Sequence, residues 1–149
     1  MQLDGKVAVV TGAASGLGRA SCMALSKAGA RIAAFDRDET RLAEVCRELG
    51  GNALGRVVDV VDEASVSAGL DAVVAKFGAV HIAVNCAGVA DASKTVSSKG
   101  QPFPLATWNK VIGINLTGTF NIIRFAALAM TRNAPEGASG ERGVIINTA

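Results

Sequence analysis

The chain has 149 residues, with 15 basic and 13 acidic side chains, and its formal net charge is +2. This length allows one domain, residues 1–149, and the balanced charge gives no reason to expect nucleic acid or an anionic membrane as a partner. Half of the residues are hydrophobic, so we expect a large core rather than a disordered chain. The single histidine, His81, excludes a histidine-rich metal site, and we expect no bound metal.

The three cysteines, Cys22, Cys46 and Cys86, are far apart and odd in number. This pattern is typical of reduced thiols in a cytoplasmic protein rather than of a disulfide framework. The first residues carry Asp4 and no basic stretch before an apolar run, so we expect no signal peptide. We also expect no membrane span, because uncharged stretches such as residues 111–123 are shorter than about 18 apolar residues.

Five short apolar runs predict strands that are buried on both faces: residues 6–11, 31–35, 54–58, 80–84 and 144–146. Apolar residues at helical spacing predict four helices between them: residues 16–27, 39–49, 62–77 and about 105–131. Strands that alternate with helices predict an α/β fold with a doubly wound parallel sheet, and we expect the strand order 3-2-1-4-5.

Two polar segments interrupt this alternation, and we expect residues 90–104 and 133–143 to form exposed loops. The last predicted strand is apolar on both sides, and the chain stops at Ala149. An uncovered apolar edge strand favours aggregation. We therefore expect either a fragment that is truncated after the fifth strand or a cover from outside these residues.

A glycine-rich segment, residues 11–18 (TGAASGLG), directly follows the first predicted strand and leads into the first helix. Its glycines, Gly12, Gly16 and Gly18, allow a sharp turn and let a phosphate approach the free N–H groups at the helix start. This strand–loop–helix context predicts a dinucleotide-binding loop, and an ordinary tight turn is the alternative.

Asp36 follows the second predicted strand. A carboxylate at this place accepts hydrogen bonds from both hydroxyls of an adenosine ribose and repels a 2′-phosphate, which predicts NAD rather than NADP. The neighbouring Arg37 favours the phosphate, but residues 13–18 contain no Arg or Lys to assist it. A cap of the following helix is the alternative role for Asp36.

With these motifs the chain resembles the NAD-using short-chain dehydrogenases/reductases along its whole length. Asp59 and Val60 resemble the pair that holds the adenine ring in that family, and residues 85–88 (NCAG) resemble its NNAG segment with Cys86 in place of the second Asn. Asn115 stands where the family has the Asn of its catalytic tetrad. Residues 143–148 resemble the strand that leads to the catalytic Ser.

The glycine-rich loop and the resemblance together give these candidate cofactor-binding residues: Gly12, Ser15, Gly16, Leu17, Gly18, Asp36, Asp59, Val60, Asn85, Cys86, Ala87 and Gly88. The NCAG variant and residues 92–95, 118–121 and 142–149 are closest to type-2 3-hydroxyacyl-CoA dehydrogenases. These enzymes oxidise the 3-hydroxyl of short acyl-CoA thioesters with NAD. The resemblance therefore implies NAD as cofactor, a small secondary alcohol as substrate, and a homo-oligomer for the full-length protein.

The family mechanism also needs a Tyr phenolate as acid and base, a Lys four residues later, and a Ser. The sequence contains no Tyr, so only Asn115 of the tetrad is present and we expect the chain alone to be inactive. Two alternatives stay open: a non-catalytic NAD-binding module, and an S-adenosylmethionine methyltransferase, which shares the sheet and a glycine-rich first loop. A nucleophilic role for Cys86 is disfavoured, because no activating group is near it in the sequence.

In the long predicted helix, six apolar residues recur at about helical spacing: Trp108, Ile112, Leu116, Phe120, Ile123 and Ala127. We expect most of them to pack in the core, and an outward strip at a dimer interface is the alternative. The basic residues Lys94, Lys99 and Arg132 are expected to be solvated surface charges, with contact to a CoA phosphate as the alternative.

Overall fold

The apolar runs form one parallel sheet in the order β3-β2-β1-β4-β5, which confirms the predicted order and fold class. The strands are β1 (Val7–Thr11), β2 (Arg31–Asp36), β3 (Ala53–Val57), β4 (Ile82–Asn85) and β5 (Val144–Asn147). The computed structural model describes residues 2–148, with the side chain of Asn52 left out, so Ala149 lies outside the described residues.

The helices begin and end close to the predicted positions. They are α1 (Gly16–Lys27), α2 (Glu39–Leu49), α3 (Glu63–Phe77), α4 (Leu105–Ile112) and α5 (Thr119–Met130). A π-helical segment, η2 (Gly113–Gly118), joins α4 and α5 into one long helix, and a 3-10 turn (Gly50–Asn52) follows α2. Aspartates cap two helices: Asp38 accepts a hydrogen bond from the Arg41 N–H, and Asp62 accepts one from the Ala64 N–H.

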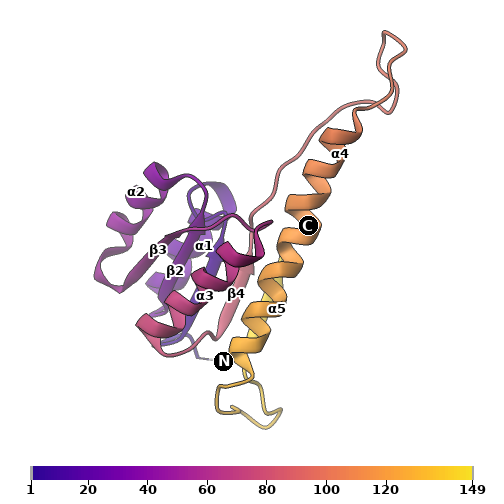
Figure 1. Cartoon of the computed structure of the whole chain (residues 1–149). Helices are drawn as coiled ribbons and strands as arrows, with labels where there is room; N and C mark the ends of the chain where they lie inside the picture. Colours follow the sequence, from indigo (N-terminus) through magenta and orange to yellow (C-terminus); the bar gives the residue numbers. More distant parts are fainter. Residues whose placement is uncertain (1, 149) are drawn as a thin grey trace.

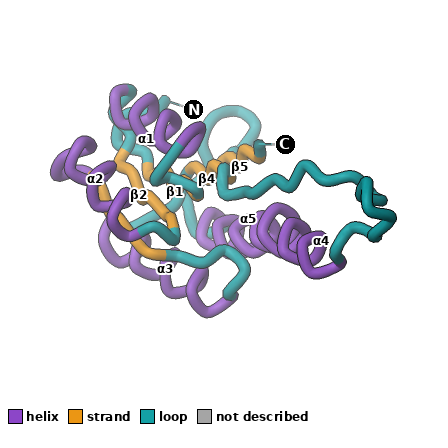
Figure 2. Tube along the Cα trace, turned by 90° about the horizontal axis from the view of Figure 1, so that it is seen from above, coloured by secondary structure: helices purple, strands orange, loops and turns teal. Residues whose placement is uncertain are grey.

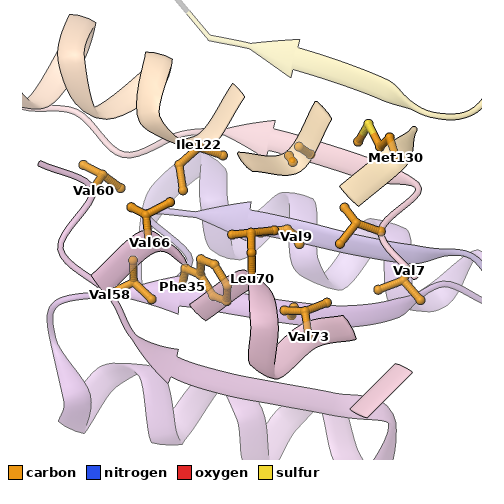
Figure 3. Packing of buried hydrophobic residues seen from close by; sticks show 14 residues of the cluster. Val7, Val9, Phe35, Val58, Val60, Val66, Leu70, Val73, Ile122 and Met130 are labelled. Atoms are coloured by element: carbon orange, nitrogen blue, oxygen red, sulfur yellow. The ribbon is translucent and has the colours of Figure 1, made fainter. Parts of the chain in front are cut away.

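Alternate strand residues point to opposite faces of the sheet, and each face carries its own core. Figure 2 shows the helices on either side of the sheet, and Figure 3 shows one of the two cores. On one face, α1 and α2 contribute Cys22 and Leu42. On the other face, α3 and α5 contribute apolar side chains such as Leu70 and Ile122, which pack with Phe35 of β2. The helices therefore cover the sheet on both sides, as a doubly wound fold requires.

The two edge strands are more exposed than predicted. In β3, Arg56 and Val57 are exposed, and in β5, Val144 and Ile146 are 40% and 48% exposed. Both strands lie at an edge of the sheet, where only one neighbour pairs with them. The prediction of burial on both faces is therefore wrong for β3, whereas the exposure of β5 agrees with the expected uncovered edge strand.

The long helix buries a different set of residues from the predicted one. Trp108, Leu116 and Phe120 are 55%, 63% and 60% exposed, so the expectation that they pack in the core is wrong. The core contacts come instead from Ile122 and Met130, with Ala126 between them. The π-helical segment η2 is wound more widely than an α-helix, which changes the residues that face the sheet after it. A prediction that assumes 3.6 residues per turn along the whole helix misses this change.

Figure 1 shows that α4 continues beyond the sheet and carries the polar loop 90–104 at its far end. The helix Leu105–Met130 has 26 residues and contains an 18-residue window with a mean hydropathy of 1.4, so by length and composition alone it could cross a membrane. The uncharged stretch within it, residues 111–123, is shorter because Lys110 and Arg124 bound it. One face of the helix packs against the sheet, as in the core helix of a layered α/β fold.

Candidate functional site

A cavity of about 400 Å³ opens beside the glycine-rich loop, where β1, β2 and β4 end. All of the predicted cofactor-binding residues except Asn85 line it. Ligands of doubly wound folds bind at the carboxyl ends of the strands, at the point where the strand order reverses. Here that point lies between β1 and β4, because β2 pairs on the other side of β1.

Two glycines of the loop are required by close backbone contacts. Gly12 has a φ of +64°, and a Cβ on it would lie 2.8 Å from the Cys86 carbonyl oxygen. A Cβ on Gly18 would lie 2.1 Å from the carbonyl oxygen of Gly12, so α1 approaches the loop as closely as its backbone allows. The loop is therefore packed tightly against both the start of α1 and the segment after β4.

The first turn of α1 faces the cavity through Ser15, Gly16, Leu17 and Gly18. Within the described part of the chain, no side-chain hydrogen bond caps this helix: the Ser15 side chain makes none. The N–H groups of the first turn of a helix, together with the helix dipole, favour an anion at this place. The loop is therefore suited to bind a phosphate, and the alternative of an ordinary tight turn does not account for these free N–H groups.

Thr11, at the end of β1, joins the two halves of the cavity wall. Its Oγ1 accepts hydrogen bonds from the backbone N–H groups of Cys86 and Ala87, both at 3.1 Å. Its side chain is 1% exposed, so this hydroxyl satisfies two donors that lie away from most of the solvent. The sequence motifs did not indicate this role for Thr11, because its partners lie far away along the chain.

Asp36 ends β2 with its carboxylate at the edge of the cavity. Its Oδ2 accepts a hydrogen bond from the Ala14 N–H at 2.9 Å, and its Oδ1 accepts one from the Asp38 N–H at 3.0 Å. The cap of α2 is Asp38 itself, so the alternative role of Asp36 as a helix cap is wrong. The adjacent Arg37 directs its Nε toward Asp59 Oδ2, 3.6 Å away.

Asp59 and Val60 form the wall of the cavity after β3. The Asp59 Oδ1 accepts a hydrogen bond from the Val61 N–H, and the Asp59 N–H donates one to Ser65 Oγ, both at 3.1 Å. Five further residues also line the cavity: Phe35, Arg37, Val58, Val89 and Ile114. Four of them directly adjoin a predicted binding residue in the sequence, which is the signal by which they could have been found.

Asn115, the predicted catalytic residue, lies in η2 and lines a second cavity of about 740 Å³. Its amide binds the backbone of Val89 twice: Oδ1 accepts from the N–H and Nδ2 donates to the carbonyl oxygen, both at 2.9 Å. The two cavities share the segment from Cys86 to Val89. The structure therefore brings Asn115 next to the predicted cofactor site, on the far side of this shared segment.

Asn85 lies in a different environment from the other predicted binding residues. Its side chain is buried in the sheet, and its Nδ2 donates a hydrogen bond to the Asn147 Oδ1 of β5 at 2.8 Å. The Asn85 Oδ1 is buried without a hydrogen-bond partner among the described residues. The structure thus gives Asn85 a place in the pairing of β4 with β5, outside the cavity wall.

The cysteines are poorly suited to nucleophilic chemistry. Burial raises the pKa of the Cys86 thiol, and hydrogen bonds with Ser21 and Thr148 only partly oppose this effect. Burial also raises the pKa of Cys22 to about 12 and the pKa of Cys46 by a smaller amount. Since the thiolate is the reactive form, these shifts agree with the expectation that Cys86 is not a nucleophile.

Comparison with known proteins links this site to one family. The family model "short chain dehydrogenase" matches residues 6–149. The 3-hydroxyacyl-CoA dehydrogenase type-2 of Drosophila melanogaster is 45% identical over 144 residues, which are 96% of this chain and 56% of that protein. The human protein of the same name is 44% identical over 148 residues, which are 99% of this chain and 56% of that protein.

A solved structure agrees with this assignment. The 3-ketoacyl-(acyl-carrier-protein) reductase from Brucella melitensis, complexed with NADH, is 33% identical to this chain and superposes with a TM-score of 0.86. The alignment covers 99% of this chain and 58% of the reductase. The chain thus spans a little over half the length of the proteins it matches. With the family model, the relatives and the shared fold in agreement, the chain belongs to the short-chain dehydrogenase family.

Proposed function

We propose that this chain is the NAD-binding part of an oxidoreductase that oxidises the hydroxyl of a 3-hydroxyacyl-CoA to the corresponding ketone. The placement of Asp36 is the observation that supports NAD most directly. Its carboxylate lies at the edge of the cavity, where it can accept hydrogen bonds from a ribose, and its charge opposes a 2′-phosphate. The one cation beside it in the sequence, Arg37, is turned toward Asp59.

The residues present fit a dinucleotide along the whole cavity. The pyrophosphate is held by the N–H groups at the start of α1, and the adenine lies against the wall of Val58, Asp59 and Val60. Leu17 lines the cavity and is 69% exposed, so a bound dinucleotide would cover an apolar side chain that is now in solvent. The segment from Cys86 to Val89 would hold the nicotinamide half, and the cofactor would supply the hydride acceptor.

The acyl-CoA substrate is supported by two relatives, 45% and 44% identical, that are both 3-hydroxyacyl-CoA dehydrogenases. For this reaction Asn115 supports the catalytic groups from the second cavity, next to the nicotinamide half. This chain contains no Tyr, and the family's acid/base is a Tyr. We therefore expect the 149-residue chain alone to bind the cofactor and to show no dehydrogenase activity.

We further propose that two copies of the full-length protein associate through the outer face of the long helix. Trp108, Leu116, Phe120 and Leu128 of this helix are each more than half exposed, and Leu116 and Phe120 also line the second cavity. Contiguous exposed apolar side chains are typical of interaction surfaces. Sedimentation velocity of the full-length protein tests this proposal: Trp108→Glu should shift a dimer toward monomer, and an unchanged sedimentation coefficient would argue against this face. A cytoplasmic location stays a prediction.

Calorimetry on the 149-residue chain tests the cofactor proposal against both alternatives. We expect NAD to bind at least about tenfold more tightly than NADP, and S-adenosylmethionine not to bind. Tight binding of S-adenosylmethionine without NAD would favour the methyltransferase, and binding of neither would overturn the proposal. To distinguish an enzyme from a non-catalytic module, NADH formation from 3-hydroxybutyryl-CoA is measured on the full-length protein, where absence of turnover would favour the module.

A further inference from the structure

The wall formed by Val58, Asp59 and Val60 is held in place from outside the cavity. The segment leaves the sheet after β3, and its last backbone hydrogen bond to a strand is the one that the Val58 N–H donates to the Asp36 carbonyl oxygen of β2 at 3.0 Å. Val60 is nevertheless 6% exposed, so its carbonyl oxygen needs a hydrogen bond from another part of the chain. This hydrogen bond comes from α5.

Asn121 of α5 supplies the donor. Its side chain is 6% exposed, and its Nδ2 donates to the Val60 carbonyl oxygen at 3.0 Å. A buried amide satisfied in this way resists displacement, because moving it would leave both polar groups without partners. Asn121, which is not among the residues that line the cavity, therefore holds one backbone group of its wall in place.

The orientation of this amide is set by a second pair of side chains. The Arg124 Nε donates a hydrogen bond to the Asn121 Oδ1 at 3.2 Å, so the Nδ2 is left to face Val60. The Arg124 guanidinium also pairs with Glu63 of α3 at 2.8 Å. Glu63 comes shortly after Val60 in the chain, so the β3–α3 connection is bound to α5 at two points.

The backbone of the long helix also approaches this wall closely. A Cβ on Gly118 would lie 2.5 Å from the Val60 Cγ2, so the helix touches Val60 at a place where only glycine fits. On the same helix, Asn115 holds the backbone of Val89 at the other end of the cavity. The long helix therefore contacts both end walls of the cavity, through Asn115 at one end and Asn121 at the other.

We propose that Asn121 is a positioning residue for adenine recognition: by holding the Val60 carbonyl it keeps the adenine wall at the spacing that a bound NAD requires. This inference rests on the proposed NAD site. It predicts that loss of the Asn121 donor weakens ligands that contain adenine and spares ligands that lack it.

The test compares two ligands on the 149-residue chain: NAD, by calorimetry, and nicotinamide mononucleotide, which has no adenine, by NMR shift titration. Asn121→Asp keeps the shape of the side chain and removes the Nδ2 donor. We expect it to weaken NAD binding about five- to tenfold, and to change the affinity for nicotinamide mononucleotide by less than about twofold.

Asn133→Asp is the matched control. Asn133 also donates from Nδ2 to a buried backbone group, at the Val80 carbonyl oxygen 2.7 Å away, but Val80 is not among the residues that line the cavity, whereas Val60 is. The same substitution there should lower the unfolding temperature and leave the affinity for both ligands within about twofold. A general loss of stability would therefore show in both variants, and an adenine-specific effect only in Asn121→Asp.

If Asn121→Asp does not fold, Arg124→Gln replaces it. This change removes the charged group that orients the amide, from a side chain that is 37% exposed, and we expect a loss of NAD affinity of about two- to threefold. Unchanged NAD affinity, or an equal loss for both ligands, would overturn the inference. If the unaltered chain takes up neither ligand, the proposed function itself fails, and this outcome is seen before any variant is measured.

Discussion

The Asp36 carboxylate accepts a hydrogen bond from the Ala14 N–H at 2.9 Å, so the end of β2 is bound directly to the glycine-rich loop after β1. The same carboxylate is the group we expect to bind the ribose. Its second oxygen accepts from the Asp38 N–H, which holds the carboxylate in one orientation before any ligand arrives. A group that is already oriented loses little conformational entropy when it binds.

Asp36→Ala should weaken NAD binding by about 10- to 100-fold, because a charged acceptor of two ribose hydroxyls is lost. Asp38→Ala is the matched control, since it removes the same charge two residues away and only the cap of α2. The control should cost about 1 kcal/mol of stability and leave NAD affinity unchanged. Calorimetry and urea unfolding measure both quantities, and equal NAD affinities for the two variants would contradict the role of Asp36.

Gly18→Ala should destabilise the fold by about 1–3 kcal/mol, because its Cβ would lie 2.1 Å from the Gly12 carbonyl oxygen and force α1 away from the loop. Gly51→Ala is the control: a Cβ on Gly51 would meet no atom within 4 Å, so we expect a change within about 0.5 kcal/mol. Urea unfolding monitored by circular dichroism gives both values. A Gly18→Ala protein as stable as the Gly51→Ala protein would refute this packing argument.

Thr11→Val should also destabilise the protein by about 1–3 kcal/mol, because the N–H groups of Cys86 and Ala87 lose their common acceptor while the shape of the side chain is kept. Thr11→Ser keeps the hydroxyl and should retain most of this stability. Because the loosened segment exposes Cys86, its thiol should also react faster with a disulfide reagent in the valine variant. Equal reaction rates in the two variants would mean that Thr11 does not hold this segment.

His81 should make the protein less stable in mild acid. Its Nδ1 accepts a hydrogen bond from the Val7 N–H at 3.1 Å, so this nitrogen must be unprotonated in the folded chain. Burial, and after it the nearby charge of Lys6, lowers the pKa of His81 below its ordinary value of 6.5, and Arg31 acts in the same direction while Glu136 opposes it. The unfolded chain therefore binds this proton more readily, so stability is full above about pH 6.5 and falls as the pH is lowered through that value.

The check on His81 is a series of urea unfolding curves between pH 8 and pH 5, with His81→Asn as the comparison. The Asn oxygen can accept the same hydrogen bond and does not titrate in this range, so the variant should show a flatter dependence on pH. Identical slopes for the two proteins would assign the acid sensitivity to other groups.

The positions of the strands and the glycine-rich loop could be predicted because each depends on local patterns, and the strand order followed from the doubly wound topology that this alternation indicates. Buried parallel strands are continuous apolar runs, and the loop between β1 and α1 carries its glycines in sequence. The residues that hold the cavity from behind could not be predicted. Thr11 and Asn121 act on backbone groups that are 75 and 61 positions away along the chain, and no local pattern shows such a pair.

The buried face of the long helix was predicted incorrectly for a similar reason. Trp108, Leu116 and Phe120 have the spacing of a core strip but are exposed. The long helix extends beyond the sheet, and no strand covers most of that extension (Figure 1). Residues of η2 also contact Val60 and Val89, which lie on two other connections. The helical period of one segment predicts neither where the sheet ends nor which other segments contact the helix.

The π-helical segment η2 contains Asn115, which binds Val89, and it ends before Asn121, which binds Val60. Removing one residue from η2 would turn α5 relative to α4 by about 100° and shorten the helix by about 1.5 Å. Asn115 and Asn121 could then not both reach their partners. This stretch of helix should therefore tolerate exchanges of side chains across related proteins far better than insertions or deletions.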